Sequence, residues 1–180
     1  MKHVEEIIQT CESKIKSIKD SYDKIQQEIR KFPDSSIYKG NWDYIPLKAR
    51  YIKNNQTKTS IHSDTFLNGL LDDKLIVTAS FSILRPGANI TPHTGYKGFA
   101  DKILRAHICI ETSDNCALLV DGKEYKYKVG KGFWFDDTFE HSAYNNGTNS
   151  RVVLLLDISR DPNNIPALVE DMVKEFEEVL

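Results

Sequence analysis

No run of apolar residues in this chain approaches the roughly 20 that a membrane-spanning helix requires, so we expect no membrane segment. Charge of one sign is not in excess either, because 24 Lys and Arg residues stand against 26 Asp and Glu, a formal net charge of −2. That balance gives no reason to expect nucleic acid or an anionic membrane surface as a partner. Residues 1–6, MKHVEE, are too charged to begin a secretory signal, which favours a cytoplasmic protein that acts on small molecules or proteins.

Cysteine is scarce and follows no pattern. The three cysteines, Cys11, Cys109 and Cys116, are odd in number and lack CxxC spacing. In a reducing compartment they would remain thiols, and we interpret them as small buried or surface side chains. Internal repeats and low-complexity segments are also missing. A chain of 180 residues is long enough for one hydrophobic core and short for two, which predicts a single domain over residues 1–180.

Amphipathic helices are predicted at both ends of the chain. Within residues 1–32, apolar residues recur in steps of three and four, which keeps one face of a helix apolar. We expect a break near residues 19–21 and an end before Pro33. This helix could pack on the protein's own sheet or serve as a dimer arm, so the oligomeric state stays open. Residues 165–180 show the same spacing and predict a C-terminal helix.

The spacing of apolar residues changes at Leu75. From there, short strand-like runs alternate with turn residues such as Pro86-Gly87 and Asp121-Gly122. Seven short strands at this spacing indicate an antiparallel sandwich or jelly roll over residues 75–160. The predicted fold class is therefore mainly β with flanking helices. The seven predicted strands cover residues 76–84, 103–110, 117–120, 123–129, 132–135, 142–145 and 152–158.

The part of the chain ahead of this core predicts shorter elements. Residues 41–48 indicate one or two strands, with Pro46 at a sheet edge because proline cannot donate to a ladder. Residues 54–58 are polar and predict a loop. Residues 63–71 predict a helical turn that faces the functional site.

Two histidines, 48 residues apart, stand beside strand-like runs. His93 follows Pro92 in a stretch that also holds Gly95, so we expect it just beyond a strand where the backbone turns, with His141 at another strand edge. A neutral imidazole offers a metal its nitrogen lone pair near neutral pH. Two histidines at strand ends of a jelly roll can meet across its open mouth. Non-haem Fe(II) oxygenases bind iron with two histidines and usually one carboxylate.

The carboxylate that an HxD motif would supply is missing, because Gly95 occupies its position. Asp137, four residues before His141, could instead ligate the metal, or could orient a histidine through its second ring nitrogen. A single histidine at a strand end is also often structural or solvated. The spacing alone therefore leaves a metal site and a structural role both open.

Arginines accompany the histidines. Arg151 begins an almost wholly apolar strand, where a charge is costly unless it is exposed or paired with an anion. Arg105 and His107 are two residues apart, so strand alternation places both on one face. A guanidinium binds a carboxylate through two parallel hydrogen bonds. Two arginines, a histidine and an iron site together would hold a dicarboxylate such as 2-oxoglutarate, although Arg151 taken alone could be a strand-edge charge.

At these residues the sequence resembles the aspartyl/asparaginyl β-hydroxylase family of Fe(II)- and 2-oxoglutarate-dependent oxygenases. The resemblance covers about residues 81–158 and includes several linked motifs in the family's order. It implies a double-stranded β-helix, a cupin-like jelly roll. The matching pieces are FSILRPG at 81–87, PHTG at 92–95, RAH at 105–107, FDDTFEH at 135–141 and Arg151.

The resemblance also implies roles for individual residues. His93 and His141 would bind Fe(II), and water would fill the place of the missing carboxylate, since animal members of the family also have PHTG. Asp137 would hold that water. Ser82 and Arg151 would bind the distal carboxylate of 2-oxoglutarate, His107 would lie by its metal-chelating end, and Arg105 would touch cosubstrate or substrate.

The implied activity is O₂-dependent hydroxylation of an unactivated C–H of a free amino acid or of an Asp- or Asn-like residue in a peptide. The stretch 96–104 is longer than in the animal enzymes, and Ile103 stands where they have an arginine that helps to bind an acidic substrate. Amino acid and peptide therefore both remain open as substrates. Two alternatives are a non-catalytic jelly-roll module that binds a carboxylate ligand, and a halogenase that binds chloride at the place left by Gly95.

Overall fold

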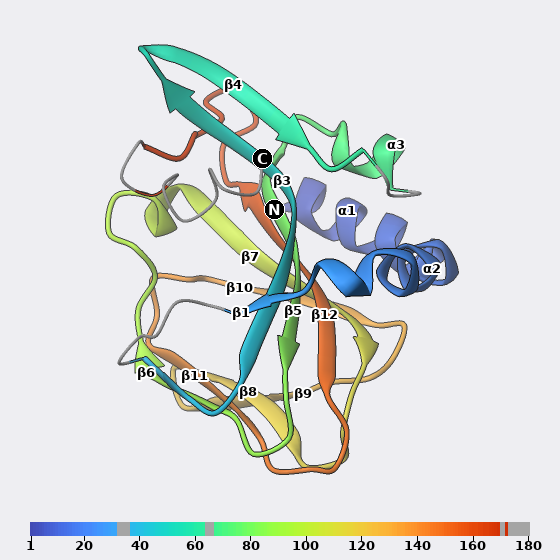
Figure 1. The fold of residues 1–180 in the computed structure, drawn as a ribbon. Helices are drawn as coiled ribbons and strands as arrows, with labels where there is room; N and C mark the ends of the chain where they lie inside the picture. The colour runs from blue at the N-terminus through green and yellow to red at the C-terminus, as the bar shows by residue number, and fades with distance from the viewer. Residues whose placement is uncertain (32–36, 64–66, 170–171, 173–180) are drawn as a thin grey trace.

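A computed structural model describes residues 1–31, 37–63, 67–169 and 172, and in this part of the chain the strands form two antiparallel sheets (Figure 1). The larger sheet has the order β1-β3-β5-β12-β7-β10, with β4 pairing β3, and the smaller one has the order β2-β6-β11-β8-β9. The predicted mainly β, antiparallel fold is thereby confirmed. The strands of the larger sheet are β1 (Arg30–Lys31), β3 (Trp42–Lys53), β4 (Gln56–Ile61), β5 (Ile76–Leu84), β7 (Ile103–Glu111), β10 (Gly132–Phe135) and β12 (Arg151–Ser159); those of the smaller sheet are β2 (Tyr38–Lys39), β6 (Asn89–His93), β8 (Cys116–Val120), β9 (Lys123–Lys126) and β11 (His141–Asn145).

The central strands of the larger sheet are buried on both faces. In β12, the even-numbered residues from Val152 to Ile158 belong to a core cluster shared with the N-terminal helices. The odd-numbered residues, from Arg151 to Asp157, face the space between the two sheets, because successive side chains of a strand point to opposite faces. β5 and β7 alternate in the same way. One face of the sheet therefore builds the core, and the other builds a pocket.

The N-terminal segment packs on the protein's own sheet, which is the first of the two arrangements expected from the sequence. It forms α1 (Lys2–Ser13), α2 (Ile15–Ile25) and the short helix η1 (Gln26–Glu28), with α1 and α2 lying against the larger sheet (Figure 1). The expected break near residues 19–21 is wrong, because the chain kinks at Lys14. The apolar steps of three and four run on without interruption across Lys14, so the pattern contained no signal for this kink. The helical part also ends earlier than expected, at Glu28 and not just before Pro33, because Arg30–Lys31 pair with β3 as strand β1.

α1 is fixed to β10 at a single close approach. A Cβ on Gly132 would lie 2.5 Å from the Ile108 side chain and 2.8 Å from that of Ile8, so only glycine permits this distance between helix and strand. The Glu12 carboxylate accepts a hydrogen bond from the Gly132 N–H at 2.9 Å and one from Lys131 at 3.2 Å. The end of α1 is thus tied to the strand that leads into Asp137.

The region ahead of β5 differs from its prediction. β3 continues to Lys53, and the expected loop at 54–58 is instead a tight hairpin: Asn54 and Asn55 have φ of 52° and 60°, the conformation of a type I′ turn. The strand that follows, β4, is polar because it is largely exposed. Pro46 lies at a register shift between β3 and β5, where a bulge accommodates it.

The short helix α3 (Asn68–Leu71) falls within the helical turn expected at 63–71, but its position differs from the prediction. Leu70 and Leu71 pack into the core cluster that contains α1, so the described part of this segment does not face the pocket. Residues 64–66 lie outside the described part of the chain. The predicted helix at 165–180 also falls mostly on residues that are not described, and it stays a prediction; within its first residues, Leu168 forms a parallel bridge with Tyr51.

From β5 onward the predicted strands agree with the structure to within about three residues at each end, a normal uncertainty for strand boundaries. The exception is β6, which the sequence did not indicate: His93 is the last residue of this strand and does not lie beyond one. The three cysteines are buried free thiols, as expected.

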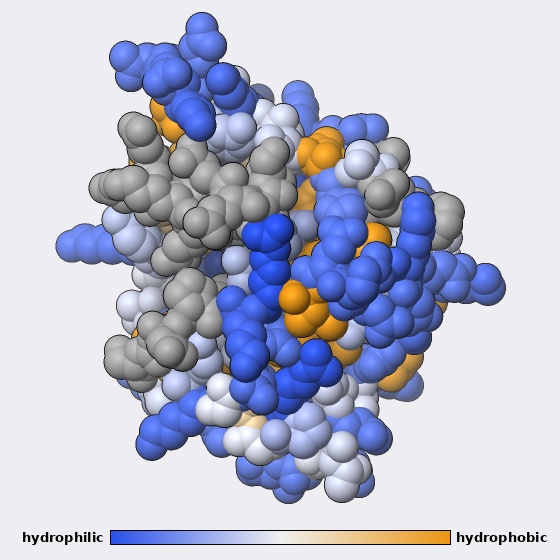
Figure 2. All heavy atoms as spheres, in the orientation of Figure 1, coloured by the Kyte–Doolittle hydropathy of each residue, from blue (hydrophilic) through white to orange (hydrophobic). Residues whose placement is uncertain are grey.

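The surface shown in Figure 2 is mostly hydrophilic, with hydrophobic residues in small separate groups. Six large apolar side chains of the described residues are exposed, among them Tyr96 and Phe139 on the loops that flank the two histidines. Scattered exposure of this kind is ordinary for a folded protein. No helix in the described residues is long and apolar enough to cross a membrane.

Candidate active site

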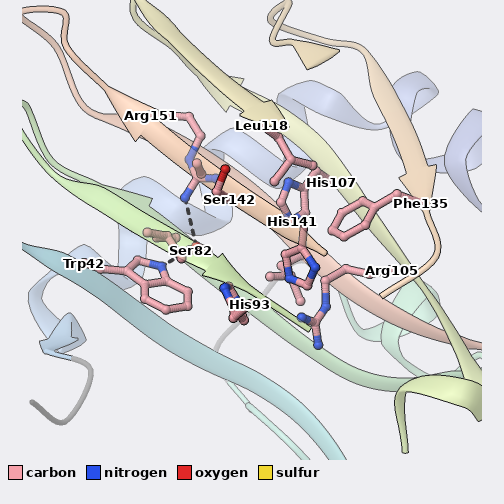
Figure 3. A pocket seen from close by; sticks show the side chains of 13 residues that line it. Trp42, Ser82, His93, Arg105, His107, Leu118, Phe135, His141, Ser142 and Arg151 are labelled. Carbon is pink, nitrogen blue, oxygen red and sulfur yellow. Dashed lines mark hydrogen bonds between the residues drawn. The ribbon is translucent and has the colours of Figure 1, made fainter. Parts of the chain in front are cut away.

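A pocket opens between the two sheets, and strand alternation decides which side chains line it. β5 contributes Ser82, β7 contributes Arg105 and His107, and β12 contributes Arg151, all from the face that looks toward the smaller sheet (Figure 3). The smaller sheet contributes His93 and His141. The pocket encloses about 380 Å³, including space open to solvent at its mouth. The remaining lining residues are Trp42, Ile90, Leu118, Phe135, Ser142, Ala143 and Leu155.

The two histidines are direct cross-strand partners. His93 at the end of β6 pairs in register with His141 at the start of β11, and their ring centroids are 4.3 Å apart. Each ring places Nδ1 next to the backbone carbonyl two residues earlier: His93 lies 2.8 Å from the Thr91 oxygen, and His141 lies 2.9 Å from the Phe139 oxygen. A carbonyl only accepts, so Nδ1 carries the proton in both rings. Both Nε2 lone pairs are therefore available for one cation.

Asp137 fills the position that a carboxylate at residue 95 would need. A Cβ on Gly95 would lie 2.6 Å from the Asp137 Cγ and 2.8 Å from the Ala100 Cβ, and the Gly95 N–H donates to the Asp137 backbone oxygen at 2.8 Å. The buried Asp137 carboxylate lies 3.4 Å from the His141 Nε2 and accepts a hydrogen bond from Arg105 at 2.8 Å. Glycine at 95 and aspartate at 137 thus form one arrangement in which the acid comes from the second loop.

These residues fit a metal ion held by two imidazoles and otherwise by exchangeable ligands. Among the described residues, no group of three or more histidine, cysteine, aspartate or glutamate side chains is placed to hold a metal ion. Two nitrogen donors with fixed tautomers, next to one carboxylate already engaged by an arginine, match the donor set that non-haem Fe(II) accepts when open positions are left for other ligands.

Arg151 is a buried cation on the pocket wall, with 1 % of its surface exposed. Its Nη1 donates to the Tyr127 hydroxyl and its Nη2 to Ser82 Oγ, both at 3.1 Å. Its Nε has no partner, and no carboxylate of the described residues lies within ion-pair distance. Ser82 Oγ also accepts from the Trp42 indole at 3.0 Å, so its own proton is left to donate. A buried guanidinium without a counter-charge is costly, which indicates a site for an anion.

His107 stays neutral beside this cation. Burial lowers its pKa well below the ordinary 6.5, and the charges of Arg151 and Arg105 lower it further. Its Nδ1 lies 3.1 Å from the Tyr127 hydroxyl. Arg151 can only donate, so the Tyr127 oxygen accepts from it and can pass its own proton toward Nδ1, which leaves the His107 Nε2–H as a donor.

This low pKa predicts how stability depends on pH. The unfolded chain protonates His107 below pH 6.5 and the native state does not, so the unfolded state binds more protons and the free energy of unfolding falls as pH drops through 6.5. We expect His107→Gln to flatten this slope by at most about 1.4 kcal/mol per pH unit. Denaturant unfolding between about pH 5 and pH 8 measures it. His141, whose pKa burial also lowers, keeps its share of the slope in the variant. An unchanged slope would show that His107 is protonated in the native state too.

Arg105 lines the pocket, yet most of its hydrogen-bonding capacity is used by the protein. Its Nε and Nη2 donate to Asp157 at 2.8 and 3.2 Å, and its Nη1 donates to Asp137 at 2.8 Å. The expected contact with cosubstrate or substrate stays a prediction, and two N–H groups remain for it.

Trp42, Tyr127 and Asp157 hold the polar side chains of the site through hydrogen bonds and were not anticipated from the sequence. A signal existed for Asp157, because it is the only acidic residue in the apolar run 151–158 and alternation places it on the same face as Arg151. Tyr127 was assigned to a strand, but β9 ends at Lys126. For Trp42 the sequence held no signal, since its contact with Ser82 depends on how β3 pairs with β5.

Two antiparallel sheets around a pocket with two histidines and a buried arginine define a jelly-roll protein of the cupin-like class. The structure is similar to the crystal structure of an oxidoreductase of the 2OG-Fe(II) oxygenase family from Burkholderia pseudomallei, with a TM-score of 0.56 over 77% of each chain. At 12% identity this likeness confirms the fold alone. The chain belongs to the aspartyl/asparaginyl β-hydroxylase family, whose model matches residues 12–161. The resemblance stated from the motifs is thus confirmed.

Curated relatives match about half of the chain. An ornithine lipid ester-linked acyl 2-hydroxylase from Rhizobium tropici is 38% identical over 96 residues, which is 51% of this chain and 32% of that protein. Aspartate beta-hydroxylase domain-containing protein 2 from Mus musculus is 30% identical over 95 residues, 51% of this chain and 27% of that protein. The match therefore spans between about a quarter and a third of the length of these relatives.

Proposed function

We propose that this protein is an Fe(II)- and 2-oxoglutarate-dependent dioxygenase that hydroxylates an unactivated C–H bond. The observation that carries the proposal is the buried Arg151, which has no anionic partner among the described residues and shares one pocket with His93 and His141. Iron, 2-oxoglutarate and O₂ would supply the oxidising chemistry, in which one oxygen atom enters the C–H bond and the other enters succinate, with release of CO₂. Family membership supports a hydroxylase.

The chain's own residues would bind and orient these components. His93 and His141 would hold the iron through Nε2, and Asp137 would hold a water in the place of the missing carboxylate ligand. At the other end of the pocket, the distal carboxylate of 2-oxoglutarate would pair with Arg151 and accept the free proton of Ser82. Neutral His107 would donate to the cosubstrate between these two ends. The apolar walls, which include Leu118 and Phe135, would exclude water and strengthen these contacts.

The substrate we propose is an amino acid or a peptidyl residue, as the names of several relatives suggest. An acyl group of a lipid is the second candidate, because the relative with that printed activity is the more similar in sequence, at 38% against 30% identity. Ile103 bears on this choice: it is fully buried with Phe99 and Leu168 and does not line the pocket, so position 103 offers no cation to an acidic substrate.

Anaerobic binding tests the proposal. Wild-type protein given Fe(II) and 2-oxoglutarate is expected to show the metal-to-ligand charge-transfer band, and to release succinate when air is admitted. His93→Ala is expected to lose both, because one of two imidazole ligands is removed. His62→Ala is the matched control, since His62 pairs with Glu28 outside the pocket. It is expected to retain the band. Folded wild-type protein that gives neither band nor succinate with iron supplied would leave a carboxylate-binding module instead of an enzyme.

A further inference from the structure

Four polar side chains cross the larger sheet in one connected row toward the histidines. Thr78 on β5 donates to Asp157 on β12 at 2.7 Å, Asp157 binds Arg105 on β7, and Arg105 donates to Asp137 at 2.8 Å. The first three residues are direct neighbours in the sheet, because Asp157 pairs in register with Thr78 on one side and with Arg105 on the other. The row ends beside the His141 Nε2.

The contact between Asp157 and Arg105 fixes the direction of the guanidinium. Two donors, Nε and Nη2, bind the two oxygens of one carboxylate, which holds the guanidinium plane in a single orientation. The third donor, Nη1, then points at Asp137. The side chains of Asp157 and Asp137 are 6% and 2% exposed, so water does not compete for these bonds. Asp157 is itself held by the Thr78 hydroxyl.

The charge of Asp157 also favours a cation at the histidines. The two aspartates and Arg105 carry a net charge of −1 next to the two imidazoles. Without Asp157 this sum is zero, and Arg105 is held at one atom only. A cation bound by the histidines would lose a favourable charge, and the guanidinium would no longer be held in one orientation.

We propose that Asp157 is a positioning residue. Through Arg105 it fixes the Asp137 carboxylate beside the metal position, and it holds the Arg105 guanidinium in one orientation on the pocket wall, which leaves Arg151 to bind the distal carboxylate. This inference rests on the proposed function. It assigns to the Thr78 and Asp157 pair a role in metal binding, although neither residue lines the pocket.

Asp157→Asn tests this role, because asparagine keeps the shape and one acceptor but loses the charge and the second acceptor. Co(II) titration of the metal-free protein, followed through the d–d absorption bands, is expected to show metal affinity reduced by about tenfold to hundredfold, with altered bands. Turnover number is expected to fall by a similar factor. The KM for 2-oxoglutarate is expected to remain unchanged, since Arg151 and Ser82 bind its other end.

Two further variants separate positioning from general damage. Asp43→Asn removes another buried aspartate that pairs with an arginine, Arg85, outside the pocket, and is expected to leave metal affinity and Co(II) bands unchanged. Thr78→Val removes only the hydroxyl that holds Asp157, and is expected to give a smaller loss in the same direction. Wild-type metal affinity and turnover in folded Asp157→Asn would overturn the inference, as would equal losses in Asp43→Asn. A wild-type protein that binds neither metal nor 2-oxoglutarate would overturn the proposed function and this inference with it.

Discussion

Replacing Arg151 by methionine is expected to abolish useful 2-oxoglutarate binding while leaving the folded protein at least as stable as before. The loss of affinity should be about 30-fold or more, because removing one partner of a buried, hydrogen-bonded charge pair costs about 2 kcal/mol at the least. Stability should not fall, since Arg151 is a buried charge without a protein counter-ion and its desolvation is relieved in the variant.

The groups that Arg151 leaves behind keep other partners. Ser82 Oγ still accepts from Trp42, and the Tyr127 hydroxyl remains next to His107. Isothermal titration with 2-oxoglutarate and Fe(II) under nitrogen measures the affinity, and thermal unfolding of the ligand-free protein measures the stability. Cosubstrate affinity within threefold of wild type would remove the main support for the proposed function.

Arg85→Met is the matched control and should behave in the opposite way. Arg85 donates to the buried Asp43 carboxylate at 2.8 Å, so its removal leaves an unpaired buried anion. We expect the melting temperature of this variant to fall while 2-oxoglutarate affinity is retained. The two arginine variants together distinguish an arginine that binds a ligand from an arginine that stabilises the fold.

Gly95→Ala is expected to inactivate the protein and to lower its free energy of unfolding by about 3 kcal/mol, the size of effect seen for overpacking and for broken buried ion pairs. The added methyl group would occupy the space of the Asp137 carboxylate, which cannot move without breaking its bond to Arg105. Adding Asp137→Ala to Gly95→Ala should restore part of the stability but no activity, because the close contact with the Ala100 Cβ remains. Chemical denaturation of the two single variants and the double variant gives the coupling free energy.

A methyl group elsewhere provides the control for this series. Gly69→Ala adds one in α3, where nothing lies within 4 Å, and should leave stability unchanged or slightly raised. Additive losses for Gly95→Ala and Asp137→Ala would contradict the steric link between the two positions.

The fold could be predicted where the sequence marks its turns with glycine or proline. Asp121-Gly122 and Pro86-Gly87 delimited strands that the structure contains. The Asn54-Asn55 hairpin was missed because its second strand, β4, is exposed and lacks the apolar alternation that identifies a strand. β6 was missed because it contains Pro92 and three polar residues, with Ile90 as its one aliphatic side chain. These two strands have little buried surface.

For the site, the sequence predicted the residue types better than their contacts. Ser82, His93, Arg105, His107, His141 and Arg151 were expected to meet, and all six line one pocket. The partner of Arg105 could not be predicted, since Asp157 is 52 positions away and becomes its neighbour only through the β7 and β12 register. Register is a property of the assembled sheet, which a single sequence does not display.

The alternation along β12 has a consequence for redesign. The even-numbered positions from 152 to 158 belong to the core cluster that includes the helices, whereas Arg151 and Leu155 on the opposite face line the pocket, so the two sets can be varied as separate libraries. A smaller residue at Leu155 would change the shape of the pocket, and so the oxoacid that fits it, without opening a void beneath α1 and α2. A smaller residue at Leu154 would open that void and leave the pocket unchanged. Alternate residues of one strand thus determine two separate properties, the packing against the helices and the shape of the pocket. Evolution toward a new cosubstrate could change the second property without changing the first.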